Sequence, residues 1–551
     1  MRTAQTIVMN PAMILTALLI VFSILGIVAL IRLIAAVVSE RASLREKQQN
    51  RVKWGGGLRY KLALAIISLA LIVTVLVPVL LHYIMSNAGL FAGLGQSEKT
   101  ALLCAVLFTA GVALIAGIIG ACVISWITMR PLRGLLRHVK MICDTENKKN
   151  LAGMEIHIAG RDEFSLLGEA INEMTRRLAK AATAASDLLI GKEIQKRLLS
   201  LEIGEDGNKL SSGYLDTENA AFFGYYEEAS QISGDYFDYS DLGGKYYAVI
   251  KCDVAGKGIP AALIMIQVAT MFLNYFKKWS PSVEGMHIEE LVYQINGFIE
   301  TLGLTGRFAA FTLCLFDSHS GDLHFCNAGD NIIHIFDSSE KRIKNITLPE
   351  TPAAGILSND MVESKGGYKV QTITLDHGDI LLMYTDGIEE SKRMFRDNQG
   401  GATVCSAGID GSPHGNHTAG QTSEEMGRER IHKIVNAVMN REIYTLRKLH
   451  YPGGEQKLQF DYSGCSGNID EVIMAIIACE KMFRCYRHHG VTKDDRVLID
   501  KKTDDFLKAH LIRYNDFCAN TIERHGNDLY YTCLKEEALY DDITILGIKR
   551  K

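Results

Sequence analysis

Four aspartates stand where apolar, strand-like runs of the chain begin or end: Asp235, Asp253, Asp386 and Asp541. Carboxylates gathered at the ends of strands repel one another unless they are protonated or share a cation. Ligation by oxygen alone selects hard cations such as Mg²⁺ or Mn²⁺ rather than zinc or copper. A pair of such cations generates hydroxide at neutral pH and hydrolyses phosphate esters. These residues therefore indicate a carboxylate site suited to metal-dependent phosphate chemistry.

The segments that must position these aspartates alternate between apolar and polar residues from about residue 220 onward. Short runs of this kind, separated by Gly, Asp and Asn turns, are typical of β-strands. The expected strands are 245–251, 311–316, 323–327, 332–336, 368–375, 380–384 and 543–548. Two expected helices, 260–277 and 287–301, interrupt them, and Pro260 suits a first helical turn. Many antiparallel strands with a few long helices predict an α+β sandwich.

Five motifs occur in a fixed order around the aspartates. They are Ser-Gly-Asp-Tyr-Phe-Asp at 233–238, Asp-Val-Ala-Gly-Lys-Gly-Ile-Pro-Ala-Ala at 253–262, Asn-Ala-Gly at 327–329, Gly-Asp-Ile-Leu-Leu-Met-Tyr-Thr-Asp-Gly-Ile at 378–388, and Asp-Asp-Ile-Thr at 541–544. Any one of them alone is a common turn sequence. Together they resemble the SpoIIE/RsbU branch of the PPM (protein phosphatase 2C-like) serine/threonine phosphatases. The resemblance covers roughly residues 190–430 and 538–550.

The resemblance implies a site for two ions, Mn²⁺ or Mg²⁺. By position, Asp235 and Asp253 would bridge or hold the pair, and the backbone carbonyl of Val254 would be a further ligand. Asp386 and Asp541 would complete the site. The implied reaction is direct hydrolysis, in which a metal-activated water attacks phosphorus without a phosphoenzyme. The resemblance also implies an αββα arrangement, a β-sandwich flanked by helices.

Two residues depart from the pattern of the family, and one choice between neighbours has to be made. Ser233 and Asp330 replace a Gly and a His that are common in the first and third motifs, although neither is a ligand position. Asp541 rather than Asp542 is the expected ligand, because the ligand in the family is the first residue of that pair. Asp542 is then expected to position the ligand residues, or to have a purely structural role, without binding the metal itself.

Three stretches near the N-terminus are almost free of charge and reach the roughly 20 residues that span a bilayer: about 11–31, 62–84 and 101–129. A cleaved signal peptide is the alternative for the first, but its apolar stretch is too long and only Arg2 precedes it. Seven Lys and Arg residues lie within 41–61. The positive-inside rule then places the N-terminus outside and the chain after Met129 in the cytoplasm. We expect a multi-pass protein of the inner (cytoplasmic) membrane, with residues 1–129 as its membrane region.

Nucleic acid is not an expected partner. The chain has a net charge of −4, and residues 1–61 carry nine Lys and Arg against two Asp and Glu, so the remainder is distinctly acidic. A nucleic-acid-binding domain normally presents a basic surface.

The stretch after the third span has the pattern of a relay domain. Leu167, Ile171, Met174 and Leu178 recur at the spacing of a coiled-coil seam. With Pro131 after the span and the Asp-Glu-Phe and Ile-Asn-Glu-Met segments, residues 130–182 resemble a HAMP domain; an ordinary amphipathic linker helix is the alternative. The resemblance implies a homodimer in which small helix shifts change the output. A helical linker, 183–205, is expected to follow.

The expected phosphatase domain, 206–551, contains an insert at about 435–535. Gly427 and Asp541 are 114 residues apart, more than is usual in the family, and the insert holds two helix-like stretches, 469–487 and 504–522. A surface elaboration is the simplest interpretation, because long insertions cost little; a docking or lid element is the alternative. Cys485, followed by two histidines at 488–489, lacks the second half of a structural zinc site.

The sequence thus predicts a multi-domain protein: transmembrane helices, a HAMP coiled coil and an α+β phosphatase domain. The expected activity is hydrolysis of phosphoserine or phosphothreonine on a cytoplasmic regulatory protein, by resemblance an anti-sigma factor antagonist. One alternative is a catalytically silent membrane receptor for a phosphoprotein, which the four intact aspartates disfavour. The other is a HAMP-linked nucleotide cyclase, which leaves Asp-Asp-Ile-Thr at 541–544 unexplained.

Overall fold

A computed structural model describes residues 95–551 except 159–162, 205–206, 230–231, 284, 397–400, 403, 405–420, 451–453, 488–496, 519–521, 526–527 and 533. The chain divides into two compact units, Met1–Ala184 and Ala185–Lys551, each described here by itself. The predicted spans at 11–31 and 62–84 lie outside the described residues.

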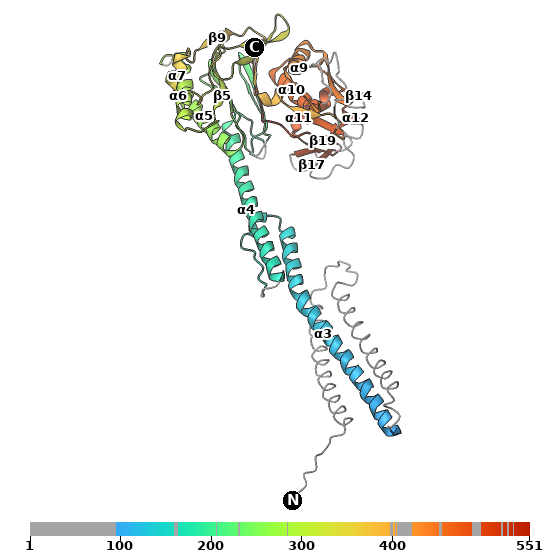
Figure 1. Ribbon diagram of the computed structural model, residues 1–551. Coiled ribbons are helices and arrows are strands. Elements are labelled where there is room, and N and C mark those ends of the chain that lie inside the picture. The colour runs from blue at the N-terminus through green and yellow to red at the C-terminus, as the bar shows by residue number, and fades with distance from the viewer. Residues whose placement is uncertain are drawn as a thin grey trace. The chain divides into compact units, whose positions relative to one another are not determined.

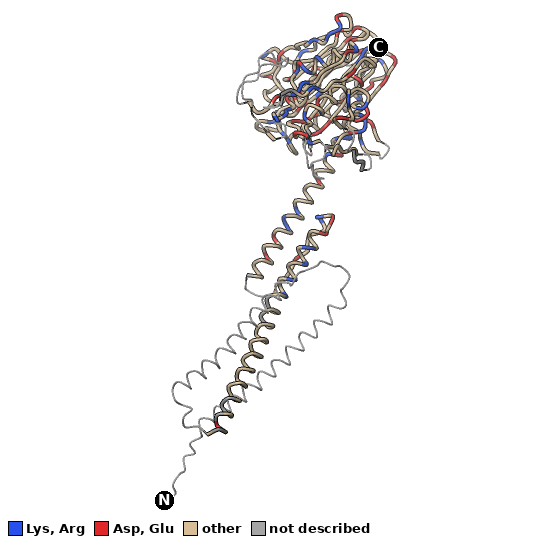
Figure 2. The backbone as a smooth tube through the Cα atoms, turned by 90° about the vertical axis from the view of Figure 1, so that its right-hand side faces the viewer, with Lys and Arg blue, Asp and Glu red and all other residues tan. Residues whose placement is uncertain are grey.

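The first unit contains a long apolar helix, α3 (Gln96–Asp144), which includes the third predicted span. Its segment Cys104–Val123 is long and apolar enough to cross a membrane by length and composition, with a mean hydropathy of 2.5. Figure 2 shows α3 without Lys, Arg, Asp or Glu over most of this part. One other described helix, α5 (Ile259–Lys278), passes the same test, but it packs into the core of the second unit. Membrane insertion of α3 stays a prediction.

A short connector joins α3 to the next helix, α4 (Glu163–Leu198), and includes the 3₁₀ helix η1 (Lys148–Leu151). The side chain of Asn172 in α4 accepts a hydrogen bond from the Ile156 amide at 2.9 Å and donates one to the Ile156 carbonyl at 3.0 Å. Ile142, Leu151 and Ala179 form a small buried cluster beside this contact. Residues 130–182 therefore fold as helix, connector and helix, while the HAMP assignment stays a prediction.

The second unit is built on two antiparallel sheets (Figure 1). The six-stranded sheet has the order β1-β2-β20-β10-β7-β8, and the five-stranded sheet has the order β3-β4-β5-β6-β9. Their strands are β1 (Ser212–Asp216), β2 (Ala220–Glu227), β3 (Tyr236–Asp241), β4 (Tyr246–Val254), β5 (Ala309–Asp317), β6 (Asp322–Ala328), β7 (Ile332–Asp337), β8 (Arg342–Thr347), β9 (Gln371–Thr374), β10 (Ile380–Tyr384) and β20 (Ile543–Arg550).

Helices cover the outer face of each sheet. α5 and α6 (Glu289–Thr301) pack on the five-stranded sheet, whereas α9 (Arg428–Asn440) and α10 (Ile469–Arg484) pack on the six-stranded sheet. Successive residues of β2 point to opposite faces, so Phe222 joins the core between the sheets and Phe223 joins the core under the outer helices. This αββα arrangement agrees with the expected α+β sandwich.

The other elements of the second unit are short or belong to the region of the predicted insert. They are α7 (Asn359–Ser364), α8 (Asp386–Glu389), β11 (Lys392–Met394), β12 (Ser423–Glu425), β13 (Ile443–His450), β14 (Gly454–Asp461), β15 (Cys485–Arg487), β16 (Val497–Ile499), α11 (Lys501–His510), α12 (Tyr514–Phe517), β17 (Ile522–His525), β18 (Asp528–Tyr531) and β19 (Leu534–Glu536). β13 and β14 form a hairpin, and β16-β18-β17 form a small sheet.

Three sequence-based boundaries are wrong. The linker expected to be helical over 183–205 leaves the helix at Leu198, because Leu199 and Leu201 are both buried and residues two apart cannot share a helix face. The expected helix 504–522 is two helices, α11 and α12, since Arg513 adopts a left-handed conformation (φ 61°) between them. The expected helix 469–487 ends as α10 at Arg484, where β15 begins.

The surface-elaboration interpretation of the insert is wrong for α10. Every residue from Val472 to Arg484 is buried, and the helix belongs to the same core as β2, β10 and β20. Gly547 in β20 permits this approach, because a Cβ there would lie 2.4 Å from Ile469 Cδ1. Part of the predicted insert is therefore a structural layer of the sandwich.

Candidate metal centre

The structure places each of the four predicted aspartates at a strand end, as expected. Asp235 immediately precedes β3, and Asp253 is the second-last residue of β4, which pairs with β3. Asp386 begins α8 directly after β10, and Asp541 lies two residues before β20, which pairs with β10. Each sheet of the sandwich thus supplies two of the four carboxylates.

The four carboxylates act on one another electrostatically. Burial raises the pKa of Asp253 to about 7, and the negative charges of Asp386 and Asp541 add to this shift. Burial and the charge of Asp253 raise the pKa of Asp235 well above its usual range. Burial and Asp541 also raise the pKa of Asp386. These raised pKa values mean that the carboxyl groups do not all ionise readily when they lie close together. A bound cation would stabilise their ionised forms.

Two ligand candidates have partners within the protein. Asp541 Oδ2 lies 3.2 Å from the Nζ of Lys257, and Asp235 Oδ2 accepts a hydrogen bond of 2.8 Å from the Thr385 hydroxyl. The carbonyl oxygen of Val254 faces the backbone just before Asp235. Within the described part of the chain, no three Asp, Glu, His or Cys side chains already surround one cation position. The donor set itself, carboxylates and one carbonyl, fits Mn²⁺ or Mg²⁺.

Asp541 and Asp542 occupy different environments. Asp542 is buried, and its Oδ1 accepts a hydrogen bond of 2.8 Å from the amide of Ala229. Asp541 is about one-third exposed and has the half-exposed Lys257 side chain as its ion-pair partner. The backbone of Asp542 also packs against Gly387, where a Cβ would lie 2.0 Å from the Asp542 carbonyl oxygen. Asp542 is held by the protein, whereas the Asp541 carboxylate is available to a ligand.

A buried lysine beside the site was not singled out in the sequence. Lys251 in β4 donates to the Tyr384 carbonyl at 2.9 Å and pairs with Asp330 Oδ2 at 2.7 Å. The Thr312 hydroxyl donates to the same Asp330 oxygen at 2.6 Å. Lys251 therefore ties β4, which carries Asp253, to the end of β10 in the opposite sheet. A charged residue in the middle of an apolar strand was the signal that could have identified it.

The end of α4 contacts the segment before Asp235. The Gln195 amide donates to the Ser233 carbonyl at 2.8 Å, and its oxygen accepts from the Ser233 amide at 3.2 Å. The Ser233 hydroxyl in turn accepts a 2.9 Å hydrogen bond from the Asp235 amide. The serine that departs from the family pattern is therefore part of the support of a predicted ligand.

Comparison with known proteins supports the phosphatase domain. Residues 243–434 match the sequence model of the family Stage II sporulation protein E (SpoIIE), a segment that includes Asp253 and Asp386. Protein IcfG of Synechocystis sp. is 24% identical over 258 residues, covering 42% of this chain and 38% of that protein. The chain thus spans about two fifths of the length of this curated relative.

Solved structures of similar proteins include two phosphatase domains. The SiaA-PP2C domain of Pseudomonas aeruginosa is 14% identical, covering 68% of this chain and 99% of that chain, with a TM-score of 0.35. The catalytic domain of the serine threonine protein phosphatase PstP, in complex with two manganese ions, is 9% identical, covering 60% of this chain and 98% of that chain, with a TM-score of 0.30. The family match and the αββα sheets support a SpoIIE-type, PP2C-like phosphatase domain in this chain.

Proposed function

We propose that this chain is a membrane-anchored, signal-coupled protein phosphatase that depends on Mn²⁺ or Mg²⁺ and removes phosphate from phosphoserine or phosphothreonine. The observation that carries the proposal is the placement of four mutually interacting carboxylates at strand ends of a SpoIIE-type domain. Without a cation, four uncompensated carboxylates at one site would destabilise the fold. With divalent cations, the same carboxylates form a site that can hydrolyse phosphate esters.

In this proposal Asp235, Asp253, Asp386 and Asp541, with the carbonyl of Val254, hold two divalent ions. The ions supply a hydroxide at neutral pH and neutralise charge on the phosphoryl group. The chain's own groups keep the ligands in place. Thr385 orients the Asp235 carboxylate through its hydroxyl, at 2.8 Å. Lys257 pairs with Asp541, and its side chain is about half exposed, so in this proposal it binds a phosphate oxygen of the substrate.

The signal would arrive through α4. This single helix contains the predicted seam and ends at Leu198, three residues after Gln195, which bonds the backbone before Asp235. Leu167, Met174 and Leu178 of the seam expose 46%, 50% and 37% of their surface. Apolar residues at coiled-coil spacing favour pairing with a second chain. We therefore propose a HAMP homodimer in which a helix shift alters the support of Asp235.

The proposed substrate is a phosphorylated cytoplasmic protein, by resemblance an anti-sigma factor antagonist. Proteins that share a fold often act on different substrates, so the fold alone does not identify the substrate of this chain. Cells that carry the wild-type protein should therefore be compared with cells that carry Asp386→Asn by quantitative phosphoproteomics. A phosphoserine or phosphothreonine site that accumulates only in the variant would identify the substrate, and a difference confined to nucleotide levels would refute a protein substrate.

The activity itself can be tested with the full-length protein in detergent and p-nitrophenyl phosphate. We expect hydrolysis that requires Mn²⁺ or Mg²⁺ and falls at least about 100-fold in Asp253→Asn, since even supporting residues of metal sites cost 10–100-fold. A rate that is independent of metal, or that survives Asp253→Asn, would refute the proposal. Incubation with ATP and GTP tests the cyclase alternative, which requires a cyclic nucleotide as product.

A further inference from the structure

Helix α10 carries a group of charged residues inside the protein. Glu480, Lys481 and Arg484 expose at most 5% of their surface, although they lie on a helix surrounded by apolar core. Two hydrogen bonds join Arg484 to both oxygens of Glu480, one of them 3.2 Å long. A buried charge destabilises the fold unless it is paired. The partners of these three residues therefore identify the segments that α10 fixes in place.

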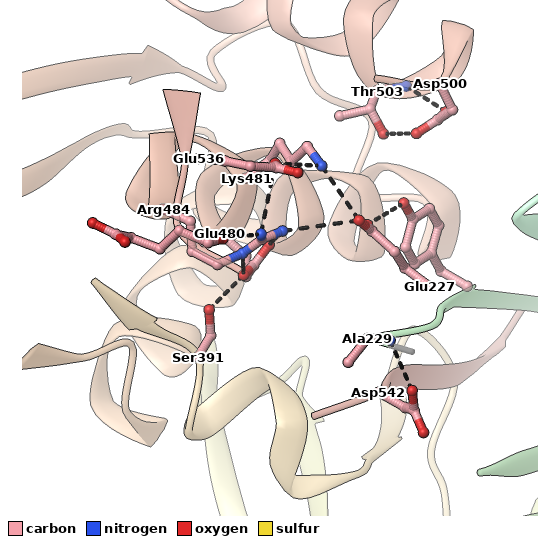
Figure 3. Close-up of polar contacts among 12 residues, drawn as sticks. Glu227, Ala229, Ser391, Glu480, Lys481, Arg484, Asp500, Thr503, Glu536 and Asp542 are labelled. Atoms are coloured by element: carbon pink, nitrogen blue, oxygen red, sulfur yellow. Dashed lines mark hydrogen bonds and ion pairs between the residues drawn. The ribbon is translucent and has the colours of Figure 1, made fainter. Parts of the chain in front are cut away.

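The first partner is the end of β2. The Nζ of Lys481 donates to Glu227 Oε1 at 3.3 Å, and the guanidinium of Arg484 lies 3.9 Å from the same oxygen. Glu227 is the last residue of β2 and leads into Ala229, whose amide binds Asp542 (Figure 3). Burial disfavours the charged form of Glu227, but Lys481 and Arg484 outweigh it and lower its pKa.

The second and third partners lie next to the other two ligand segments. The Ser391 hydroxyl, five residues after Asp386, donates to Glu480 Oε1. The carboxylate of Glu536, five residues before Asp541, lies 2.8 Å from Lys481 Nζ and 3.6 Å from Arg484 Nη1. Arg484 Nη1 also donates to the carbonyl of residue 537 at 2.9 Å. Figure 3 shows Ser391, Glu536 and Glu227 around the side chains of Glu480, Lys481 and Arg484.

Each of the three segments that reach α10 thus continues within five to eight residues to a predicted metal ligand. The end of β2 precedes Asp235, Ser391 follows Asp386, and Glu536 precedes Asp541. The fourth ligand candidate, Asp253, lies near the end of β4, which pairs with β3, the strand that Asp235 precedes. The segments that lead to the other three ligand candidates therefore share one anchor, which a purely apolar helix would not supply.

We propose that α10 is a brace for the carboxylate centre, in which Glu480, Lys481 and Arg484 are positioning residues that fix the segments leading to Asp235, Asp386 and Asp541. The inference rests on the proposed phosphatase function for its metal but not for its geometry. The brace makes cation affinity depend on a helix that lies within the predicted insert, remote in sequence from three of the ligands.

The test uses the full-length protein with Ser391→Ala and Lys481→Met, each of which removes part of the brace without touching a ligand. Tyr531→Phe is the matched control: its hydroxyl donates to the buried carboxylate of Asp504 at 2.8 Å and lies 3.4 Å from the hydroxyl of Tyr514, two partners inside the insert region that are not brace residues. Mn²⁺ binding is measured from the free-ion signal in electron paramagnetic resonance, and hydrolysis of p-nitrophenyl phosphate gives the rate at saturating Mn²⁺. Hydrogen exchange of peptides that contain Ala229 and Asp541 is followed without metal.

We expect both brace variants to weaken Mn²⁺ binding about 10-fold while the rate at saturating Mn²⁺ changes less, because supporting residues of metal sites typically cost 10–100-fold in affinity. Exchange at Ala229 and Asp541 should accelerate in both, and Tyr531→Phe should match the wild type. Unchanged exchange and binding in both variants, or equal changes in Tyr531→Phe, would overturn the brace. A wild type that binds Mn²⁺ without hydrolysing phosphate would refute only the proposed function. If the wild type binds no Mn²⁺, the hydrogen-exchange results alone test the brace: faster exchange at Ala229 and Asp541 in both variants supports it, and unchanged exchange overturns it.

Discussion

Replacing Lys251 by methionine should destabilise the second unit, Ala185–Lys551, strongly. Lys251 is 5% exposed and donates to the Tyr384 carbonyl at 2.9 Å and to Asp330 at 2.7 Å. Methionine retains an unbranched side chain, one atom shorter than that of lysine, but leaves the Asp330 carboxylate without its cation. Breaking a buried ion pair from one side costs about 3–5 kcal/mol. Because the Asp330 side chain is 18% exposed, we expect a loss near the lower limit, about 3 kcal/mol, in the free energy of unfolding.

The assay is pulse proteolysis of the metal-free full-length protein across a urea series, which reports the unfolded fraction of the second unit. Asp330→Asn retains an oxygen acceptor and should cost less than Lys251→Met. The double variant should be more stable than the sum of the single losses predicts, by about 2 kcal/mol, since neighbouring charges couple. Lys344→Met removes partly exposed ion pairs with Asp337 and Glu340 and serves as the control, with a loss below about 1 kcal/mol expected. A loss below about 1 kcal/mol in Lys251→Met, or strict additivity, would refute this role of Lys251.

Three further predictions concern the fold, the site and the dimer. Burial lowers the pKa of His334 to about 3, so the unfolded chain binds a proton at this residue before the folded chain does as the pH falls below 6.5. Lowering the pH from 6.5 to 5 should therefore destabilise the wild type by about 2 kcal/mol relative to His334→Asn in urea unfolding, since the carboxyl groups with a raised pKa act alike in both proteins. Gly387→Ala should reduce hydrolysis about 100-fold at unchanged secondary structure, because its Cβ would lie 2.0 Å from the Asp542 carbonyl oxygen and must displace the ligand segment; a normal rate would contradict that contact. Met174→Cys should form a disulfide-linked dimer in oxidised membranes, whereas Glu169→Cys on the outer side of the seam should not; equal cross-linking of both, or none, would argue against the HAMP dimer.

Much of the sandwich could be predicted from local sequence. β10 begins and ends where the apolar run between Gly378-Asp379 and Asp386 predicts, because a Gly-Asp turn and an Asp-Gly turn enclose a run of strand length. The four aspartates were identifiable for the same reason, since each terminates or opens such a run. The first strands were missed: β2 is buried along almost its whole length and has no polar alternation to reveal it.

Long-range polar contacts could not be predicted from the sequence. In the sequence, Glu480, Lys481 and Arg484 have the pattern of the exposed polar side of an amphipathic helix. Their contacts with β2, Ser391 and Glu536 show that this side is buried inside the protein. Lys251 and Asp330 are 79 residues apart and meet only because β5 pairs with β4 on one side and with β6, which leads to Asp330, on the other. The local sequence pattern predicts helices and strands, whereas contacts between residues far apart in the sequence depend on tertiary packing.

The central claim, that the four aspartates form one dimetal phosphatase centre, can be tested by phosphate release from a phosphoserine peptide as a function of Mn²⁺. Asp235→Asn, Asp253→Asn, Asp386→Asn and Asp541→Asn are compared with wild-type protein in detergent, and circular dichroism verifies their folding. The account predicts Mn²⁺-dependent release by the wild type and a loss of at least about 100-fold in each variant. Release without metal, or a wild-type rate in any one of the four variants, would contradict it.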